Sequence, residues 1–484
     1  MGELLTASRT ASVPDGTHRN LLLLTFDQFR GDWCDPDAPV IELPNILGLA
    51  GNGWSGRCYA TSPQCVPARF SWTTGRYPSQ LGVTRHRNVD LPANAPSVIR
   101  DLHERGWWTE LVGKTHLTAH VKGRDLRDNA QRLDALGFDR VLEIAGPRGL
   151  RHVECALTDA WHDAGVLERH REDLERRYAS GHRPDAWAVR PTVLPNELYP
   201  DIWLSDQAAT RIEALPEDRP WIFWVSLVGP HEPFDTPAPW SGRHGDADLP
   251  DPAPEPDWIS SLPRGASARR ASDAWSQLDE RAIRACRRDY ADHLRLLDDQ
   301  VGHLLRALDA RPDAHRTAVA LTADHGELLG DGGMLYKGTF LEGAVRVPWI
   351  YRPAPCDANE EAIRTTHPLG ITPLLTACLT NHAEGGDFQR LQERSAEENT
   401  VFCEYGEEVM AVSGNRKLVL DGRRRPLWAT DLEHDSGEQV NLITADRRAW
   451  RRDASWKALV HEGRQYLKHR RRRDWRVLTV EEVG

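Results

Sequence analysis

Four short apolar runs, each followed at once by polar residues, constrain the fold of this chain more than any other feature. These runs are Leu21–Phe26, Thr109–Val112, Trp221–Val228 and Ala318–Thr322. Each is too uniformly apolar for a strand with one face in water, which is typical of a strand buried on both faces. Helical patterns lie between them, at Pro44–Ala50, Ala95–Arg105 and Arg281–Leu308. We therefore predict an α/β fold with buried parallel strands and helices on both faces of the sheet.

Residues able to do chemistry follow all four runs. They are Asp27 and Gln28 after the first run, Lys114 and His116 after the second, His231 after the third, and Asp324 and His325 after the fourth. In open α/β sheets, ligands bind beyond the carboxyl ends of the strands. A single acidic residue at such a place is usually a helix cap. Two carboxylates, three imidazoles, a lysine and an amide at four strand ends instead predict one shared polar site.

Two stretches interrupt the alternation of strands and helices. Residues 145–200 are charged and helical, and residues 235–280 are rich in Pro, Asp, Ser and Arg. We predict both as insertions over the surface near the strand ends, where loops would contact a substrate. For residues 235–280, a solvated linker is an equally good interpretation.

The sequence pattern changes near residue 400. Short strands separated by turn residues are predicted at Val401–Tyr405, Val409–Ser413, Arg416–Leu420 and Leu427–Asp431, followed by a helix at about Arg448–Tyr466. This pattern predicts a small C-terminal antiparallel sheet packed with one helix. We accordingly divide the chain into a larger α/β domain at 1–385, which contains both insertions, and an α+β subdomain at 386–484.

Composition excludes some partners. The formal net charge is −11, and no apolar stretch approaches the ~20 residues of a membrane-spanning helix. We therefore expect neither general nucleic-acid binding nor a membrane anchor. The beginning of the chain lacks the apolar centre of a secretory signal, and none of the eight cysteines forms a Cys-x-x-Cys pair. These observations predict a reduced, cytoplasmic protein.

The segment SPQCVPARFSWTTGR, residues 62–76, is the most informative in the sequence. Its Cys-x-Pro-x-Arg pattern, followed by Thr-Gly-Arg, resembles the signature of type I sulfatases in the alkaline phosphatase superfamily. Other segments extend the resemblance over nearly the whole chain: TFDQFRGD, GKTH, PHEPF, TADHGELLGDGGMLYKG, EGAVRVPWI and ATDLEHDSGEQVNL. The resemblance implies an alkaline phosphatase-like fold, with a large mixed, mostly parallel sheet. It also implies hydrolysis of a sulfate ester by a formylglycine made from Cys65.

The resemblance further implies one divalent cation, held by Asp27, Gln28, Asp324 and His325 together with Cys65. Carboxylate and amide oxygens suit Ca²⁺, which we expect, whereas an imidazole ligand suits Mn²⁺ or Zn²⁺ better. Many members of the family have a second Asp at the position of Gln28. The Asp-Gln pair also resembles phosphonate monoester hydrolases of the same superfamily.

The nucleophile implied by the resemblance is a hydrated formylglycine at residue 65. One of its hydroxyls would attack sulfur, and His116 is our candidate for the base that then releases sulfate. Arg69, one helical turn after Cys65, would steady the hydrate.

Two lysines complete the predicted catalytic set. Only six of the 61 basic residues are lysines, and Lys114 and Lys337 both fall inside motif segments, where they would bind the sulfate oxygens. His231 or Lys337 would protonate the departing alkoxide. Four acidic residues lie near the motifs, but as helix caps or loop anchors they need no catalytic role: Asp32, Glu327, Asp331 and Glu342.

Three functions fit the sequence. The first is a sulfatase that acts on a small-molecule or carbohydrate sulfate ester after maturation by a formylglycine-generating enzyme, and the Lys-His pair of GKTH favours it. The second is a phosphonate monoester or phosphodiester hydrolase, in which we would expect neutral hydroxyl groups in place of that pair. The third is a non-catalytic metal-binding homologue with unmodified Cys65. The sequence carries no signal for an oligomeric state.

Overall fold

The computed structural model describes residues 19–51, 53–179, 188–275, 278–357, 363–384, 400–446, 450 and 452–470. Within these residues a nine-stranded mixed sheet forms the centre of the molecule, in the order β4-β3-β5-β1-β6-β8-β2-β7 with β9 beside β2. Its strands are β1 (Asn20–Asp27), β2 (Trp54–Tyr59), β3 (Trp108–Lys114), β4 (Arg140–Ile144), β5 (Trp221–Pro230), β6 (Thr317–Ala323), β7 (Arg346–Val347), β8 (Trp349–Arg352) and β9 (Ile363–Gly370). The predicted large, mostly parallel sheet is confirmed.

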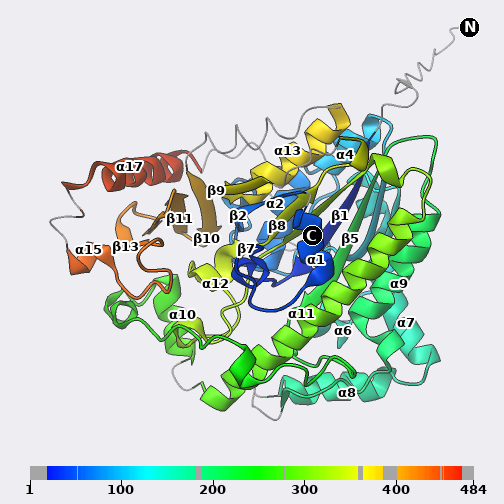
Figure 1. Cartoon of the computed structure of the whole chain (residues 1–484), viewed down its shortest axis with the longest axis horizontal. Helices are drawn as coiled ribbons and strands as arrows, with labels where there is room; N and C mark the ends of the chain where they lie inside the picture. The colour runs from blue at the N-terminus through cyan, green and yellow to red at the C-terminus, as the bar shows by residue number, and fades with distance from the viewer. Residues whose placement is uncertain are drawn as a thin grey trace, which may run out of the picture.

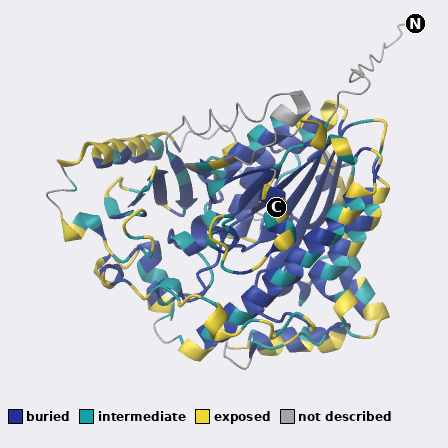
Figure 2. Ribbon diagram, in the orientation of Figure 1, coloured by how far each residue is buried: buried dark blue, intermediate teal, exposed yellow. Residues whose placement is uncertain are grey.

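The four predicted apolar runs fall in β3, β5, β1 and β6, which are neighbours in that order and run parallel. Every residue of β1, β5 and β6 is buried, and Figure 2 shows the central strands of the sheet in the colour of buried residues. Burial on both faces explains why these strands read as unbroken apolar runs. Because the four strands are parallel, their carboxyl ends meet at one edge of the sheet.

Helices cover both faces of the sheet. They include α1 (Pro44–Gly51), α2 (Cys65–Thr74), α4 (Val98–Glu104), α9 (Pro200–Glu213), α11 (Glu280–Asp309) and α13 (Ile371–Glu384). Figure 1 shows α9 and α11 along one face, with α2, α4 and α13 grouped across the other. The helix predicted to begin at Ala95 begins instead at Val98, because Ser97 caps it by accepting a hydrogen bond from the backbone N–H of Arg100.

The two insertions are packed segments. Residues 145–200 contain α6 (Pro147–Leu150), α7 (Ala156–Asp163) and α8 (Leu167–Arg177), although 180–187 lie outside the described residues. Residues 235–280 contain α10 (Ser267–Trp275). The buried Trp258 and Ile259 of this second insertion belong to a hydrophobic cluster that includes Trp428 of the C-terminal sheet. This burial favours a packed insertion over the alternative of a solvated linker.

The C-terminal part has the predicted antiparallel sheet and helix. The strands are β10 (Val401–Tyr405), β11 (Glu408–Ser413), β12 (Arg416–Leu420) and β13 (Pro426–Asp431). Val409 and Ala411 of β11 pack with α17 (Ala454–His469), whereas the alternate residues Met410 and Val412 join the cluster of Trp258. α17 begins later than predicted, because Asp453 accepts hydrogen bonds from the N–H groups of residues 455 and 456.

The remaining described α-helices are the short α3 (Pro78–Leu81), α5 (Ala130–Ala135), α12 (Glu342–Val345) and α15 (Leu442–Ala445). The predicted domain boundary at 385/386 lies in residues 385–399, outside the described residues, so the division into 1–385 and 386–484 stays a prediction. Among the described helices, none combines the length and the apolar character that crossing a membrane would require.

Candidate active site

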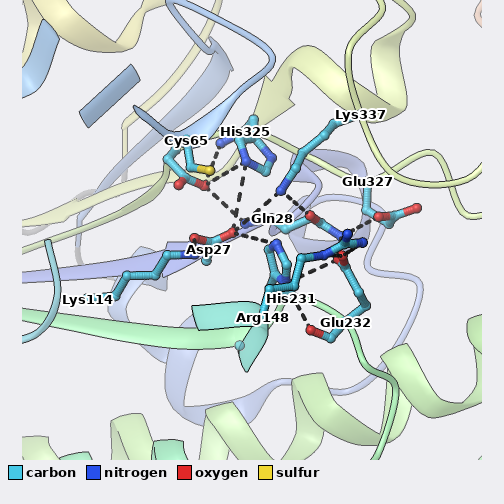
Figure 3. A network of polar contacts seen from close by, with 12 residues as sticks. Asp27, Gln28, Cys65, Lys114, Arg148, His231, Glu232, His325, Glu327 and Lys337 are labelled. Atoms are coloured by element: carbon cyan, nitrogen blue, oxygen red, sulfur yellow. Dashed lines mark hydrogen bonds and ion pairs between the residues drawn. The ribbon is translucent and has the colours of Figure 1, made fainter. Parts of the chain in front are cut away.

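Asp27, the last residue of β1, is fully buried at the centre of the site (Figure 3). Its Oδ2 forms an ion pair with Lys114, the last residue of β3. Its Oδ1 has no hydrogen-bond partner among the described residues. Nε2 of His231 and Nε2 of His325 each lie 3.9 Å from this oxygen, and Nζ of Lys337 lies 4.0 Å from it. A buried anionic oxygen thus faces three nitrogen atoms without touching any of them.

Asp324 follows β6, and Arg69 of α2 links it to Asp27. Nε of Arg69 donates to Oδ2 of Asp324 at 2.7 Å, and Nη2 lies 3.4 Å from Oδ2 of Asp27. Oδ1 of Asp324 accepts from the backbone N–H groups of Gln28 at 3.1 Å and of His325 at 2.9 Å. Arg69 therefore holds the two carboxylates together, while its expected support of a hydrate at residue 65 stays a prediction.

His325 presents a bare ring nitrogen to the site. Its Nδ1 lies 3.0 Å from the carbonyl oxygen of Gly326, which can only accept, so we assign the proton to Nδ1. Nε2 is then a lone-pair donor, and it is buried without a hydrogen-bond partner among the described residues. It lies 3.6 Å from Oδ1 of Asp324. This tautomer is the one that binds a metal ion through Nε2.

The amide of Gln28 is oriented by two carboxylates. Nε2 donates to Glu232 Oε2 at 3.1 Å and to Glu327, which leaves Oε1 to accept from Nζ of Lys337 at 2.6 Å. The amide orientation follows from this network, since a carboxylate cannot donate. Gln28 adopts a positive φ of 72°, and its carbonyl oxygen accepts from the hydroxyl of Tyr290 at 2.8 Å.

The predicted metal ligands therefore lie together. Asp27, Gln28, Asp324 and His325 meet at the ends of β1 and β6, and ligand atoms of Cys65, Asp324 and His325 lie within 4.8 Å of one another. A buried polar atom without a partner costs about 1–3 kcal/mol. Asp27 Oδ1 and His325 Nε2 are two such atoms on the same site, and a bound cation would satisfy both. The donor set fits a divalent cation.

Cys65 is the first residue of α2, all ten residues of which are buried. Pro67 is tolerated there because the first helical turn needs no backbone N–H donors. Gly75 of the Thr-Gly-Arg motif ends the helix with a positive φ of 65°, and its N–H donates to the carbonyl of Ser71 at 2.8 Å. The signature thus encodes a buried helix that begins at the cysteine and ends at the glycine.

The thiol of Cys65 lies among histidines and a lysine. Nδ1 of His86, from an exposed loop, is 3.7 Å from Sγ. Burial alone would raise the pKa of this thiol, but His116 and Lys337 hold it well below its usual range. Side chains that favour an anion therefore surround residue 65.

The two other predicted histidines are buried imidazoles. Burial and the charge of Lys114 lower the pKa of His116 to about 3, and its Nδ1 has no hydrogen-bond partner among the described residues. Burial also lowers the pKa of His231 to about 3, even though Nδ1 is 3.1 Å from a carboxylate oxygen of Glu232. Burial thus disfavours the charged form of both rings, whereas Cys65 favours the charged form of His116 and Glu232 that of His231.

Sequence reasoning missed Glu232 and gave Glu327 only an anchoring role. Glu232 lies inside PHEPF and accepts from Nε of Arg148 at 2.7 Å. Burial opposes its ionisation, but His231 and Arg148 lower the pKa of Glu232 to about 2. Glu327 does anchor its loop, by accepting from the N–H of Leu329 at 3.0 Å, and it also binds Gln28. The only signal for either glutamate was its place within two residues of a motif histidine.

A cavity of about 780 Å³ lies against part of this site. The predicted catalytic residues Cys65, Lys114, His116, His231 and Lys337 all line it. Both insertions reach it as well, the first through Arg148, Arg151 and His152 and the second through Ala274 and Trp275. Arg69 is not among its lining residues, which fits its position beneath the two carboxylates.

Known proteins resemble this chain over most of its length. An arylsulfatase of Clostridium perfringens is 24% identical over 92% of this chain and 94% of that protein. A choline-sulfatase of Rhizobium meliloti is 26% identical over 74% of this chain and 66% of that protein. The crystal structure of the phosphonate monoester hydrolase of Agrobacterium radiobacter is similar with a TM-score of 0.71, at 21% identity over 94% of this chain and 95% of that one. At this identity the structural likeness shows the fold alone.

A family model described as Sulfatase matches residues 19–355. The match begins just before β1 and ends after β8, so it includes Cys65 and both carboxylates, Asp27 and Asp324. Since it spans well over half of the 484 residues, the chain belongs to the sulfatase family of sulfuric ester hydrolases.

Proposed function

We propose that this protein hydrolyses a sulfate monoester with residue 65 as nucleophile, after conversion of Cys65 to formylglycine. One observation carries the proposal: Cys65 shares a cavity with Lys114 and Lys337 and lies beside a cation site with two unpaired ligand atoms. A sulfate ester repels nucleophiles because of its negative charge, and positive groups placed around its oxygens reduce this repulsion.

The cation would be held by Asp27, Gln28, Asp324 and His325. When bound, it supplies positive charge that polarises the sulfate oxygens and favours an ionised nucleophile. We propose Ca²⁺, because three of these four side chains offer oxygen; Mn²⁺ or Zn²⁺ would gain more from the imidazole. Arg69 positions both carboxylates. Glu232 and Glu327 accept from the amide nitrogen of Gln28, so the amide oxygen points away from these two glutamates.

The remaining residues would bind the sulfate group and move protons. Conversion to formylglycine supplies a hydrate with two hydroxyls on one carbon, so that attack on sulfur and release of sulfate use different oxygens. Lys114 and Lys337 bind the sulfate oxygens, and His231 or Lys337 protonates the leaving alkoxide. His116, one ring nitrogen of which lies within 4.8 Å of Sγ of Cys65, takes up the proton during release. Maturation by a formylglycine-generating enzyme and a cytoplasmic location belong to the same proposal.

The second candidate is a phosphonate monoester or phosphodiester hydrolase. Two observations support it. Gln28 occupies a position where many sulfatases have an acidic residue, and the fold is similar to that of a phosphonate monoester hydrolase. Lys114 and His116 favour the sulfatase, because they place a cationic and a basic group beside the nucleophile. In the second candidate we would expect neutral hydroxyl groups at these two positions.

The test is a matched set of para-nitrophenyl esters of sulfate, phosphate, diester phosphate and phenylphosphonate, on one metal-loaded sample. We expect the highest kcat/KM for the sulfate ester and no turnover by Cys65→Ala. A higher kcat/KM for the diester or phosphonate would instead establish the second candidate. Mass spectrometry of the Cys65 peptide from the same sample should show an aldehyde in place of the thiol. Full activity with an unmodified thiol would contradict the proposed nucleophile.

A further inference from the structure

Arg151 lies on a wall of the cavity that the proposed chemistry does not use. Its guanidinium lies 4.9 Å from the centre of the Tyr178 ring, and its Nε donates to the carbonyl oxygen of Arg148 at 3.0 Å. Its anionic partner is Glu175, at 3.1 Å from Nη1. The side chain of Glu175 is 62% exposed, and such surface ion pairs contribute little because water screens them. Arg151 can therefore exchange this partner for a ligand.

The neighbouring Arg148 provides an internal comparison. Its guanidinium lies 4.9 Å from the Tyr178 ring and 5.6 Å from the Tyr336 ring, and it donates to the buried carboxylate of Glu232. The side chain of Glu232 is 2% exposed, so the charge of Arg148 is balanced inside the protein. Of these two arginines that line the cavity, Arg151 is the one whose carboxylate partner is exposed to water.

The second insertion adds an aromatic group to the same cavity. Trp275, at the end of α10, lines the cavity and meets Tyr336 edge-on, with ring centres 5.3 Å apart. An aromatic side chain in a cavity wall offers a flat apolar surface to a ring. The volume of about 780 Å³ lies within the roughly 300–1,000 Å³ of small-molecule sites. The cavity thus has room for a substantial alcohol part beside the sulfate group.

Resting on the proposed sulfatase function, we infer that Arg151 determines substrate specificity. It binds a second anionic group, a carboxylate or another sulfate, on the alcohol part of a ring-bearing sulfate ester whose ring lies against Trp275. A guanidinium recognises such groups through paired, charge-assisted hydrogen bonds. A cationic alcohol such as choline would instead meet a like charge, which disfavours it.

The experiment compares para-nitrophenyl sulfate with the same ester carrying one ring carboxylate. Wild-type protein should show the lower KM for the carboxylated ester, and Arg151→Gln should raise that KM about tenfold or more. The KM for the plain ester and kcat for both should stay within about twofold, since Arg151 has no part in the proposed chemistry. Arg151→Lys should restore part of the preference. Arg176→Gln removes the same charge from an exposed position of α8 and should change neither KM.

An equal rise of both KM values in Arg151→Gln would overturn the inference, as would a larger kcat/KM for choline sulfate than for the carboxylated ester. Binding of the two product phenols, measured by calorimetry, tests the subsite without turnover. Tighter binding of the carboxylated phenol that is lost in Arg151→Gln supports the inference, and equal binding of both phenols overturns it. If neither ester is hydrolysed, the proposed function fails, and the calorimetry still decides the role of Arg151.

Discussion

Two buried clusters of lysine and carboxylate groups in this protein differ in how completely their charges are paired. In the active site, Asp27 is surrounded by lysines and histidines, yet its Oδ1 has no hydrogen-bond partner among the described residues. Between β12 and the main sheet, Nζ of Lys417 lies 2.9 Å from Oε1 of Glu342 and 2.7 Å from Oε1 of Glu438. Lys417 is as fully buried as Asp27.

This difference in charge pairing distinguishes a ligand-binding site from a contact that only stabilises the fold. In the Lys417 cluster the two glutamates surround the one ammonium, and the backbone N–H of Glu342 donates to Glu438 at 2.7 Å. Oε1 of Glu438 is also without a hydrogen-bond partner among the described residues, but Nζ of Lys417 lies 2.7 Å from it, whereas the nitrogen atoms that face Oδ1 of Asp27 lie 3.9–4.0 Å away. The catalytic cluster leaves ligand atoms of Asp27 and His325 unpaired, which has a physical reason only if another group binds there.

The largest expected effect follows from changing one carboxylate to an amide in each cluster. Asp324→Asn should lower kcat/KM for a sulfate ester by at least about a thousandfold, because it removes a charge from the cation site. The matched variant Glu438→Gln should keep kcat/KM within about threefold, since it lies outside the cavity. Initial rates on metal-loaded, correctly modified protein check both. Similar losses in the two variants would show that the clusters do not differ in the way we describe.

For the free energy of unfolding, we expect the larger loss from a change in the Lys417 cluster. Lys417→Met leaves the buried Glu438 and the half-buried Glu342 without their cation, and breaking a buried ion pair in this way costs about 3–5 kcal/mol. Urea unfolding should show this loss, while kcat/KM at low temperature stays near that of wild type. A variant that is as stable as wild type would mean that Lys417 does not hold the C-terminal sheet against α12.

Removal of the metal ion tests whether the cation binds in the active-site cluster and not in the Lys417 cluster. Chelation should abolish turnover and lower the free energy of unfolding by about 2–3 kcal/mol if the cation is present at a hundred times its Kd. Asp324→Asn should lose much of this metal-dependent stability, whereas Glu438→Gln should retain all of it. Thermal unfolding with and without chelator measures the difference. Equal effects of the chelator on both variants would place the cation elsewhere.

The smallest effect is a pH dependence of the Lys417 cluster. Burial raises the pKa of Glu438 from 4.5 to about 7, so the folded protein holds this proton more tightly than the unfolded chain does. Its contribution to stability is therefore complete below pH 4.5 and is lost as the pH rises through about 7. Glu438→Gln should flatten this decline by on the order of 1 kcal/mol. Unfolding curves at several pH values check it; an unchanged slope would contradict the raised pKa.

Much of the fold could be predicted from the sequence because its signals are local. Strands buried on both faces have to be apolar throughout, which identified β1, β3, β5 and β6 within a few residues of their ends. The C-terminal strands β10 and β12 also match their predicted bounds, since turn residues such as Gly414 separate them. The signature around Cys65 encodes its own helix, with Gly75 at the end where φ is positive.

The packing of the second insertion, residues 235–280, could not be predicted from local sequence signals. Residues 235–280 have the composition of a solvated segment. Their burial depends on Trp258, whose ring centre lies 5.0 Å from the ring centre of Trp428. These two aromatic rings come from segments that are far apart in the sequence. A single sequence contains no local pattern that pairs them.

The sequence by itself determined which chemical groups this protein has at its strand ends, because parallel strands and a helix-initiating cysteine carry their signals in neighbouring residues. Only the tertiary structure decided how these groups are held. Gln28 is oriented by Glu232 and Glu327, which lie 204 and 299 positions further along the chain. Asp324 is joined to Asp27 by Arg69, and Arg151 reaches the cavity through a packed insertion. Such contacts depend on how distant segments pack, and packing is a property of the whole folded chain.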